Sequence, residues 1–215
     1  MKNRLLLTTY SFMAALALGV LGSASTAAAQ FTIPDGYRAQ IGQWNGQGGM
    51  RLQNKVTGAC GWIAFGTGGL QGDVVVNGSG ARDEIHIATS PVIRYCTSST
   101  SSKLTPLVYN GHRLTVDALG GNDTISGGGN GNELVVDGSS GKDLVQNYAG
   151  WETWGGSEDD KLYGMWNDWM QGEGGNDIFH ITTGTQADTA NGGPGDDTIC
   201  GGTAVHIIDV EFGCI

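Results

Sequence analysis

The feature that most constrains the fold is a short block rich in glycine and aspartate, which recurs through the second half of the chain. Its most complete copy, residues 192–200, fits the nonapeptide pattern G-G-x-G-x-D-x-U-x at every defined position, where U is a large apolar residue. Looser copies begin at or surround the following residues: Gly120, Gly128, Gly138, Gly155, Asp168, Gly172 and Asp188. Tandem repetition at a short period is typical of folds in which each repeat packs on its neighbours.

These blocks resemble the RTX family, the haemolysin-type calcium-binding nonapeptide repeats of exported bacterial proteins. The convincing coverage is residues 117–202, with a looser extension back to about residue 68. The resemblance implies a β-roll that depends on calcium. The chain departs from the family in having an apparent N-terminal export leader, and in showing no catalytic or pore-forming partner domain. Both departures argue against toxin activity.

Each block divides into a turn and a strand. The glycines permit a left-handed backbone, and the x-U-x end is a short strand whose central side chain points inward. We therefore predict an all-β fold, a parallel β-roll or β-helix solenoid with right-handed coils of about 18–20 residues, two blocks per coil. Trp154 falls in an inward slot, and Ala190 is a small exception. The other expected core residues are Ile125, Val135, Val145, Leu162, Met170, Phe179 and Ile199.

The acidic residues of alternate blocks fall on the same side of such a fold, in two ladders. One ladder contains Asp123, Asp143, Asp160, Asp177 and Asp197, which recur every 17 or 20 residues. The opposite ladder contains Glu133, Glu152, Asp168 and Asp188. Asp83 lies 40 residues before Asp123, a separation that two coils would span. Asp73 and Asp83 are the weakest candidates.

Stacking at about 4.8 Å brings carboxylates together with nothing basic between them, so that they raise one another's pKa. Calcium takes roughly 6–8 oxygen ligands from carboxylates and main-chain carbonyls. We therefore predict Ca²⁺ sites built from the two ladders and from carbonyls of the glycine-rich turns, such as those of Gly175, Gly193 and Gly195. The alternative is a solenoid whose aspartates only cap their own turns.

Residues 1–29 have the features of a signal peptide. Lys2 and Arg4 precede an apolar stretch, and Ala27, Ala28 and Ala29 form a cleavage pattern that predicts processing before Gln30. The alternative for this segment is a membrane anchor. No later stretch of the chain approaches the ~20 apolar residues of a span. We expect residues 30–67 to form N-terminal capping strands and residues 68–215 to form the β-roll. The mature protein is then extracellular or periplasmic.

The charge of the chain is strongly uneven. Removal of two basic residues with the leader changes the net charge from −10 to −12. Residues 30–116 carry seven Lys/Arg and four Asp/Glu, whereas residues 117–215 carry two Lys/Arg and seventeen Asp/Glu. This excess of negative charge excludes nucleic acid as an expected partner and favours bound cations.

Four cysteines are present: Cys60, Cys96, Cys200 and Cys214. An even number in an exported protein predicts two disulfides. Three pairings are possible, and proximity in the sequence favours Cys60–Cys96 and Cys200–Cys214. A zinc site is disfavoured because the chain has no C-x-x-C motif.

No catalytic residue is predicted, because neither H-E-x-x-H nor G-x-S-x-G occurs. The first hypothesis is therefore a non-catalytic calcium-binding protein with a structural or adhesive role. The second is a carbohydrate- or surface-binding module in which Trp151 and Trp166, both in turn positions, form an exposed platform. The third, a polysaccharide-acting enzyme, needs basic groups, and the acidic half offers only Lys142 and Lys161.

Overall fold

The computed structural model describes residues 27–89, 96, 103–129, 133–147, 152–164, 169–181, 189–201 and 206–213. The described residues form strands β1 to β18 and no helix. They therefore contain no helical segment that could cross a membrane. Most of the predicted leader lies outside the described residues, and the first strand begins at Ala29, one residue before the predicted cleavage point.

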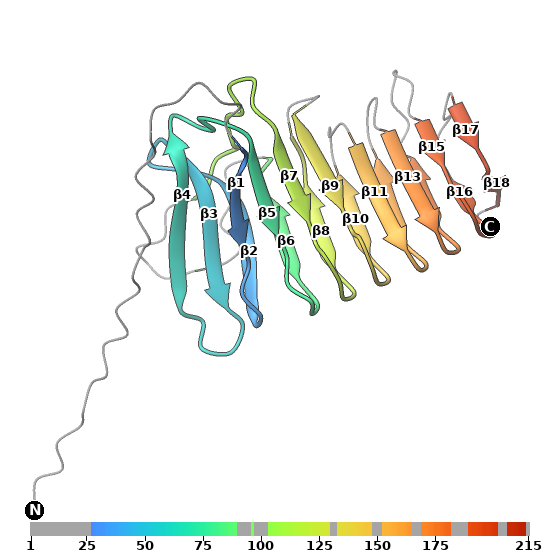
Figure 1. Cartoon of the computed structure of the whole chain (residues 1–215), viewed down its shortest axis with the longest axis horizontal. Helices are drawn as coiled ribbons and strands as arrows, with labels where there is room; N and C mark the ends of the chain where they lie inside the picture. The colour runs from blue at the N-terminus through green and yellow to red at the C-terminus, as the bar shows by residue number, and fades with distance from the viewer. Residues whose placement is uncertain are drawn as a thin grey trace, which may run out of the picture.

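The strands form two sheets that run side by side along the molecule (Figure 1). Sheet A contains β1 (Ala29–Thr32), β5 (Val74–Asn77), β7 (Leu114–Asp117), β9 (Leu134–Asp137), β11 (Glu152–Ser157), β13 (Trp169–Gly174), β15 (Thr189–Asn191) and β17 (His206–Ile208). Sheet B contains β2 (Tyr37–Trp44), β3 (Gln47–Asn54), β4 (Cys60–Thr67), β6 (Glu84–Ile87), β8 (Thr124–Gly127), β10 (Leu144–Asn147), β12 (Lys161–Gly164), β14 (Ile178–Ile181), β16 (Thr198–Cys200) and β18 (Glu211–Phe212).

From β5 onward, successive strands alternate between the two sheets and every pairing is parallel. We call one strand of sheet A, the turn that follows it and the next strand of sheet B a unit. The all-β class and the parallel sheets confirm the coarse fold prediction, and the alternation is consistent with a β-roll. Each unit brings its turn to the same edge of the molecule, which is what aligns the acidic residues.

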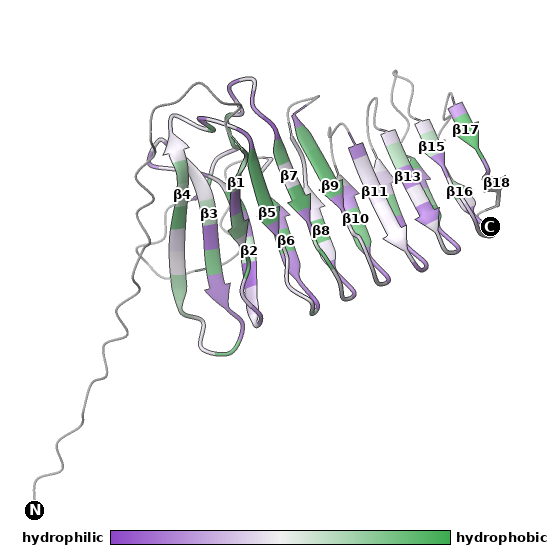
Figure 2. Cartoon of the chain, in the orientation of Figure 1, coloured by the Kyte–Doolittle hydropathy of each residue, from purple (hydrophilic) through white to green (hydrophobic). Residues whose placement is uncertain are grey.

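The hydrophobic core lies between the two sheets as columns of side chains, one residue per unit. The sheet B column is 0–3% exposed and contains Ile85, Ile125, Val145, Leu162, Phe179 and Ile199. The facing column contains Val76, Val116, Val136, Thr153, Met170 and Ala190. Figure 2 shows β5 and β9 mainly hydrophobic and β11 pale, so apolar burial weakens along the repeats.

Two of the predicted core residues are wrong by one position. In β9 the buried residues are Leu134 and Val136, whereas Val135 is half-buried on the outer face. In β11 Thr153 is 1% exposed and takes the inward position, and Trp154 faces outward. Because side chains alternate along a strand, a shift of one residue exchanges the two faces. Residues 128–136 follow the nonapeptide spacing with Glu133 in the aspartate position, so the spacing alone did not fix the register of β9.

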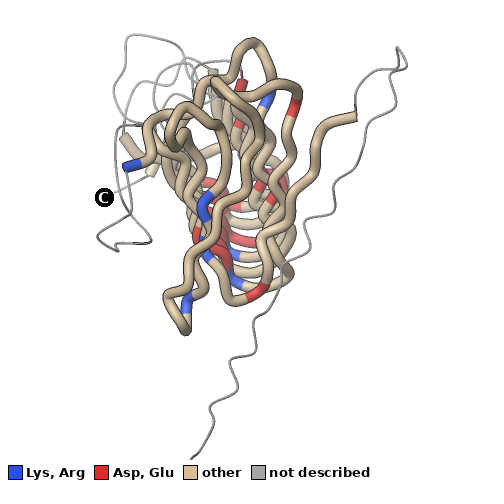
Figure 3. Tube along the Cα trace, turned by 90° about the vertical axis from the view of Figure 1, so that its left-hand side faces the viewer, with Lys and Arg blue, Asp and Glu red and all other residues tan. Residues whose placement is uncertain are grey.

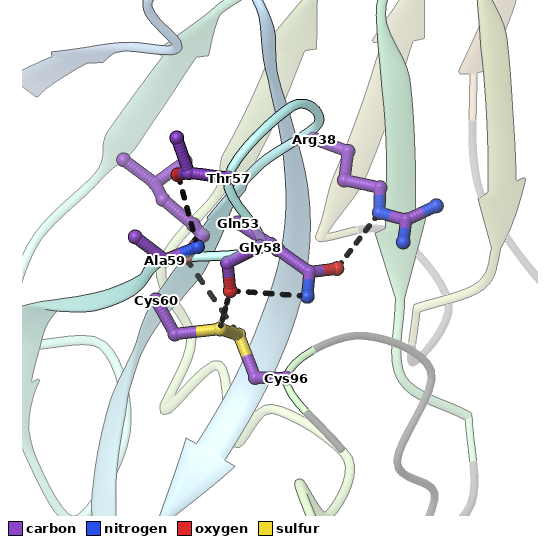
Figure 4. Close-up of a disulfide and its surroundings, with 8 residues drawn as sticks. Arg38, Gln53, Thr57, Gly58, Ala59, Cys60 and Cys96 are labelled. Atoms are coloured by element: carbon purple, nitrogen blue, oxygen red, sulfur yellow. Dashed lines mark hydrogen bonds between the residues drawn. A yellow bond between two sulfur atoms is a disulfide. The ribbon is translucent and has the colours of Figure 1, made fainter. Parts of the chain in front are cut away.

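The chain closes the N-terminal end with an antiparallel arrangement. Strands β2, β3 and β4 pair antiparallel, while β1 and β2 also extend the two parallel sheets. The rings of Phe31 and Phe65 pack with centroids 4.9 Å apart. The disulfide Cys60–Cys96 ties β4 to the connection between β6 and β7, as predicted (Figure 4). Cys200 is also disulfide-bonded, and its predicted partner, Cys214, lies outside the described residues.

The spacing between Asp83 and Asp123 was misread from the sequence as two coils. Strand β6 pairs directly with β8, with Glu84 opposite Thr124, so the 40 residues form one coil and not two. The additional length lies in the connection between Ile87 and Leu114, which contributes buried side chains such as Leu104. An insertion of this kind changes the period without changing the stacking of the strands.

The outward shift in β9 can be tested with two identical substitutions on adjacent residues. Val136→Ala removes methyl groups from a side chain that is 1% exposed, and should lower the free energy of unfolding by about 2 kcal/mol. Val135→Ala, its matched control on the outer face, should cost under about 1 kcal/mol. Denaturant unfolding in calcium-containing buffer measures both. A larger cost at Val135 would restore the register predicted from the sequence.

Candidate metal site

Six aspartates form a ladder along the edge where the turns lead from sheet A to sheet B, each immediately before a strand of sheet B. They are Asp83, Asp123, Asp143, Asp160, Asp177 and Asp197, and each is at most 2% exposed. Seen along the molecule, acidic residues of successive units lie one behind another (Figure 3). The structure thus brings together the five predicted members of this ladder and adds Asp83.

Each aspartate from Asp123 to Asp197 binds the main chain of the preceding unit. The N–H of Asp83 donates to Oδ1 of Asp123 at 2.6 Å, and the N–H of Asp123 donates to Oδ1 of Asp143 at 2.7 Å. The same bond recurs at 2.7–2.8 Å up to Asp197. One oxygen of each of these five carboxylates is therefore used to hold neighbouring units in register.

The second carboxylate oxygen has no hydrogen-bond partner among the described residues. This holds for Oδ2 of Asp123, Asp143, Asp160, Asp177 and Asp197, all of which are buried. Asp83 uses its oxygens the other way round, because its Oδ2 accepts the N–H of Ser79 at 2.5 Å and the Ser79 hydroxyl at 3.0 Å, while its buried Oδ1 has no partner. Buried polar atoms are usually paired, so a row of six unpaired carboxylate oxygens indicates a missing positive partner.

The turn geometry explains the glycines of the pattern. In the five six-residue turns that end at Asp123, Asp143, Asp160, Asp177 and Asp197, the second and fourth residues have positive φ, between 67° and 159°: Leu119, Ser139, Gly156, Glu173 and Gly193, then Gly121, Gly141, Glu158, Gly175 and Gly195. The first residue is a glycine in all of these turns except the one that begins at Ala118, for a different reason. At Gly172 a Cβ would lie 2.1 Å from Oδ2 of Asp177 and 2.6 Å from the carbonyl oxygen of Gly192 in the next unit. A carboxylate oxygen and a main-chain carbonyl from neighbouring units therefore converge beside this glycine.

The three predicted carbonyl donors lie in these stacked turns. The carbonyl oxygen of Gly175 points at Gly195, whose Cβ, if present, would lie 1.6 Å from it. Gly193 packs in the same way on the carbonyl of Glu173. A Cβ on Gly193 would lie 2.2 Å from that carbonyl oxygen. The turns thus pack main chain against main chain, with carbonyl oxygens directed along the ladder.

Burial raises the pKa of every aspartate from Asp123 to Asp197, and neighbouring carboxylates raise it further against the lowering effect of the main-chain hydrogen bonds. The pKa reaches about 7 at Asp123, about 6 at Asp143, about 8 at Asp160 and about 6 at Asp177, and it is raised at Asp197. Holding all of these groups ionised at neutral pH is therefore unfavourable without a cation.

A second, exposed row runs beside the ladder and carries its own countercharge. Oδ1 of Asn122 accepts the N–H of Lys142, and Oδ1 of Asp159 accepts the N–H of Asn176. Lys142 also forms an ion pair with Asp159. Both members of that pair are exposed, so this lysine neutralises the outer row and leaves the buried aspartates without a basic partner.

The second predicted ladder, on the opposite edge, does not form between its two described members. Glu152 lies opposite Val135, so Glu133 is two residues out of register with it. Oε1 of Glu133 instead accepts the N–H of Gly111 at 3.1 Å. The shifted start of β9 is the physical reason. Asp168, Asp188, Trp151 and Trp166 lie outside the described residues.

The donor set fits a hard divalent cation. The available donors are buried carboxylate oxygens and main-chain carbonyls, the oxygen ligands that calcium prefers. Within the described ranges, no three side chains of His, Cys, Asp or Glu gather as a side-chain metal cluster. A site on this ladder must therefore draw several ligands from the main chain, which is what the glycine-rich turns expose.

Sequence reasoning undervalued Asp83, which the structure places at the head of the ladder. The signal was present in the residues that follow it, because Asp83-Glu84-Ile85 repeats the D-x-U half of the pattern. The preceding turn obscured it, since Ser79 and Ala81 stand where later turns have residues of positive φ.

Comparison with known proteins assigns the repeats. Residues 167–180 and 180–203, which include two of the described ladder turns, match the family described as RTX calcium-binding nonapeptide repeat (4 copies). No curated protein and no solved structure matches the chain significantly. Residues 167–203 therefore carry RTX calcium-binding nonapeptide repeats, the repeats by which this family binds Ca²⁺.

Proposed function

We propose that this protein is an exported, non-catalytic calcium-binding protein with a structural or adhesive role, whose repeats wind into a right-handed solenoid when calcium is bound. RTX repeat proteins are typically secreted, and the leader-like residues 1–29 and the disulfide Cys60–Cys96 support export to an oxidising, calcium-containing compartment.

The observation that carries the proposal is the row of buried, unpartnered Oδ2 atoms from Asp123 to Asp197. A cation bound there would supply the missing partner of each oxygen and remove the repulsion between neighbouring carboxylates. Because each oxygen meets carbonyls of the next unit, the site exists only when units are stacked. Calcium binding is then coupled to folding.

The proposed ligands are carboxylate oxygens and carbonyls of the same edge. The carboxylates are those of Asp123, Asp143, Asp160, Asp177 and Asp197, and the carbonyls include those of Gly175, Gly193 and Gly195. Asp168 and Asp188 are proposed as ligands on the opposite edge, where their blocks follow the repeat. Calcium would supply charge compensation there and on the ladder, while the protein supplies the stacked turns.

The proposal predicts a folding transition driven by calcium. The mature protein should show little β-sheet circular dichroism in chelator and recover it in millimolar calcium. Asp177→Asn keeps an oxygen to accept the N–H of Asp160 but removes the charge, so it should shift the calcium midpoint upward by about tenfold or more.

Asp35→Asn is the matched control, because Asp35 is an exposed acidic residue in the turn after β1 and belongs to neither ladder. It should leave the calcium midpoint unchanged. If the chelated protein is fully folded and takes up no calcium, the proposal is wrong.

The raised pKa values predict opposite pH trends with and without metal. The ladder aspartates have pKa values of about 6 to 8 in the folded, metal-free protein, against 3.8 ordinarily. At a pH between these values, the folded form therefore holds more protons than the unfolded chain. In chelator, any residual folded fraction should therefore be highest near the acid end of this window and should fall as pH rises through it. In saturating calcium the trend should reverse, because protons and calcium compete for the same oxygens. Stability that rises with pH in chelator would show that the ladder ionises at no cost.

A second candidate function, glycan binding, is favoured by one exposed aromatic residue. Trp169 is 45% exposed and lies opposite Glu152 on the outer face of sheet A, and Trp154 faces outward on the adjacent strand. An exposed indole beside acidic and amide groups can stack on a sugar ring while neighbouring groups bind its hydroxyls.

Glycan binding can be tested by a single substitution on this face. Trp169→Ala should abolish retention on an array of neutral glycans, since it removes the exposed stacking surface. Thr189→Ala, on the neighbouring strand opposite Trp169, is the control and should bind as the unmodified protein does. Absence of glycan binding by the unmodified protein dismisses this candidate without affecting the calcium proposal.

A further inference from the structure

The C-terminal end of the ladder differs from every other described level. Six residues, 192–197, join β15 to β16, but only Asp209 and Val210 join β17 to β18. Both turns connect the same two sheets, but the last turn is four residues shorter. It therefore covers only the start of the turn before it. The carbonyls of Gly193 and Gly195 are therefore not enclosed by a following turn as those of Glu173 and Gly175 are.

Asp209 occupies the position that a glycine holds in the preceding units. The N–H of Gly192 donates to the carbonyl of Ile208, the residue before Asp209, at 3.0 Å. In an internal unit, the N–H of Gly138 donates in the same way to the carbonyl of Trp154, the residue before Gly155. A Cβ on Gly192 would lie 2.2 Å from the carbonyl oxygen of Asp209 and 2.3 Å from Oδ2 of Asp197. The usual pair of oxygens thus converges here, and Asp209 adds a carboxylate to the same end.

These residues enclose a hollow of about 340 Å³. It is lined by Gly193, Gly195, Asp196, Asp197, Asp209 and Val210, so three carboxylates and no basic side chain face it. Asp197 is 2% exposed, and its Oδ2 has no partner in the part of the chain that the structure describes. A buried, unpaired carboxylate oxygen at the wall of an acidic hollow calls for a cation rather than for packing.

We infer that this terminal hollow binds a divalent cation of its own, whose coordination shell is completed by exchangeable water. The inference rests on the proposed calcium function and adds a site at the free end of the last repeating turn, to which Asp209, outside the repeating turns, contributes. Internal cations would be enclosed by turns on both sides, whereas this one has a turn on one side and solvent on the other. Calcium needs roughly 6–8 oxygens, and the short turn cannot supply the share that a full turn supplies. The terminal site is therefore weaker than the internal ones and exchanges faster.

Calcium titration calorimetry of the mature protein tests this with two matched variants. Asp209→Asn should remove the weakest class of sites or lower its affinity at least about tenfold, without changing the calcium midpoint of the circular dichroism transition. Asp35→Asn, an exposed acidic residue at the opposite end of the sheets from Asp209, should titrate as the unmodified protein does. Equal stoichiometry and affinity in the Asp209 variant and the unmodified protein overturn the inference.

Manganese provides a second readout that reports coordinated water directly. Mn²⁺ added to the calcium-loaded protein should occupy the exchangeable site and enhance water proton relaxation, and Asp209→Asn should abolish most of that enhancement. No enhancement in the unmodified protein overturns the inference. If the protein binds no calcium and does not fold with it, the proposed function fails as well. If it folds with calcium but Asp209→Asn has no effect on either readout, only the terminal site fails.

Discussion

The bond from each aspartate N–H to the carboxylate of the next unit is the interaction on which the repeat structure depends. It recurs at 2.6–2.8 Å from Asp83 to Asp197 and sets the stacking of the turns. The bond uses one carboxylate oxygen and buries the other, so the stacking that builds the ladder also creates its electrostatic cost. In the proposed function a bound cation removes that cost, and metal binding is then part of the folding energetics rather than an addition to a finished fold.

The ladder has two unlike ends. At its head, Ser79 donates two hydrogen bonds to the Asp83 carboxylate, and Lys55 donates to the carbonyl of Arg82. The antiparallel strands and the disulfide Cys60–Cys96 stabilise the same end without any contribution from the ladder. At its tail the last turn is short and acidic. Local contacts therefore support the head of the ladder, although Oδ1 of Asp83 is buried there without a partner, whereas the described residues give the tail no such support.

The distribution of apolar residues follows the same direction. The early units bury two valines or a leucine and a valine from each strand of sheet A, as in β5 and β9. Later units place Thr153 or Ala190 in the corresponding position. Less apolar area is buried there, so the hydrophobic contribution per unit is smaller and the turns must contribute more. The family match falls in these later units, where the glycine pattern is most complete.

The sequence by itself determined the all-β class, the turn-and-strand division of each block and the five aspartates of one ladder, because the glycine and aspartate spacing repeats the period of the stacked units. Most of the inward side chains followed from the same spacing, as at Phe179 and Ile199. Only the tertiary structure decided the faces of Val135 and Trp154, since a shift of one residue in the strand register exchanges the two faces and the repeat spacing does not fix that register. It also placed Asp83 directly beside Asp123, because pairing of β6 with β8 ignores the length of the connection between them. The short final turn that opens the hollow at Asp197 likewise follows from how the last strands pair, which the repeat pattern does not encode.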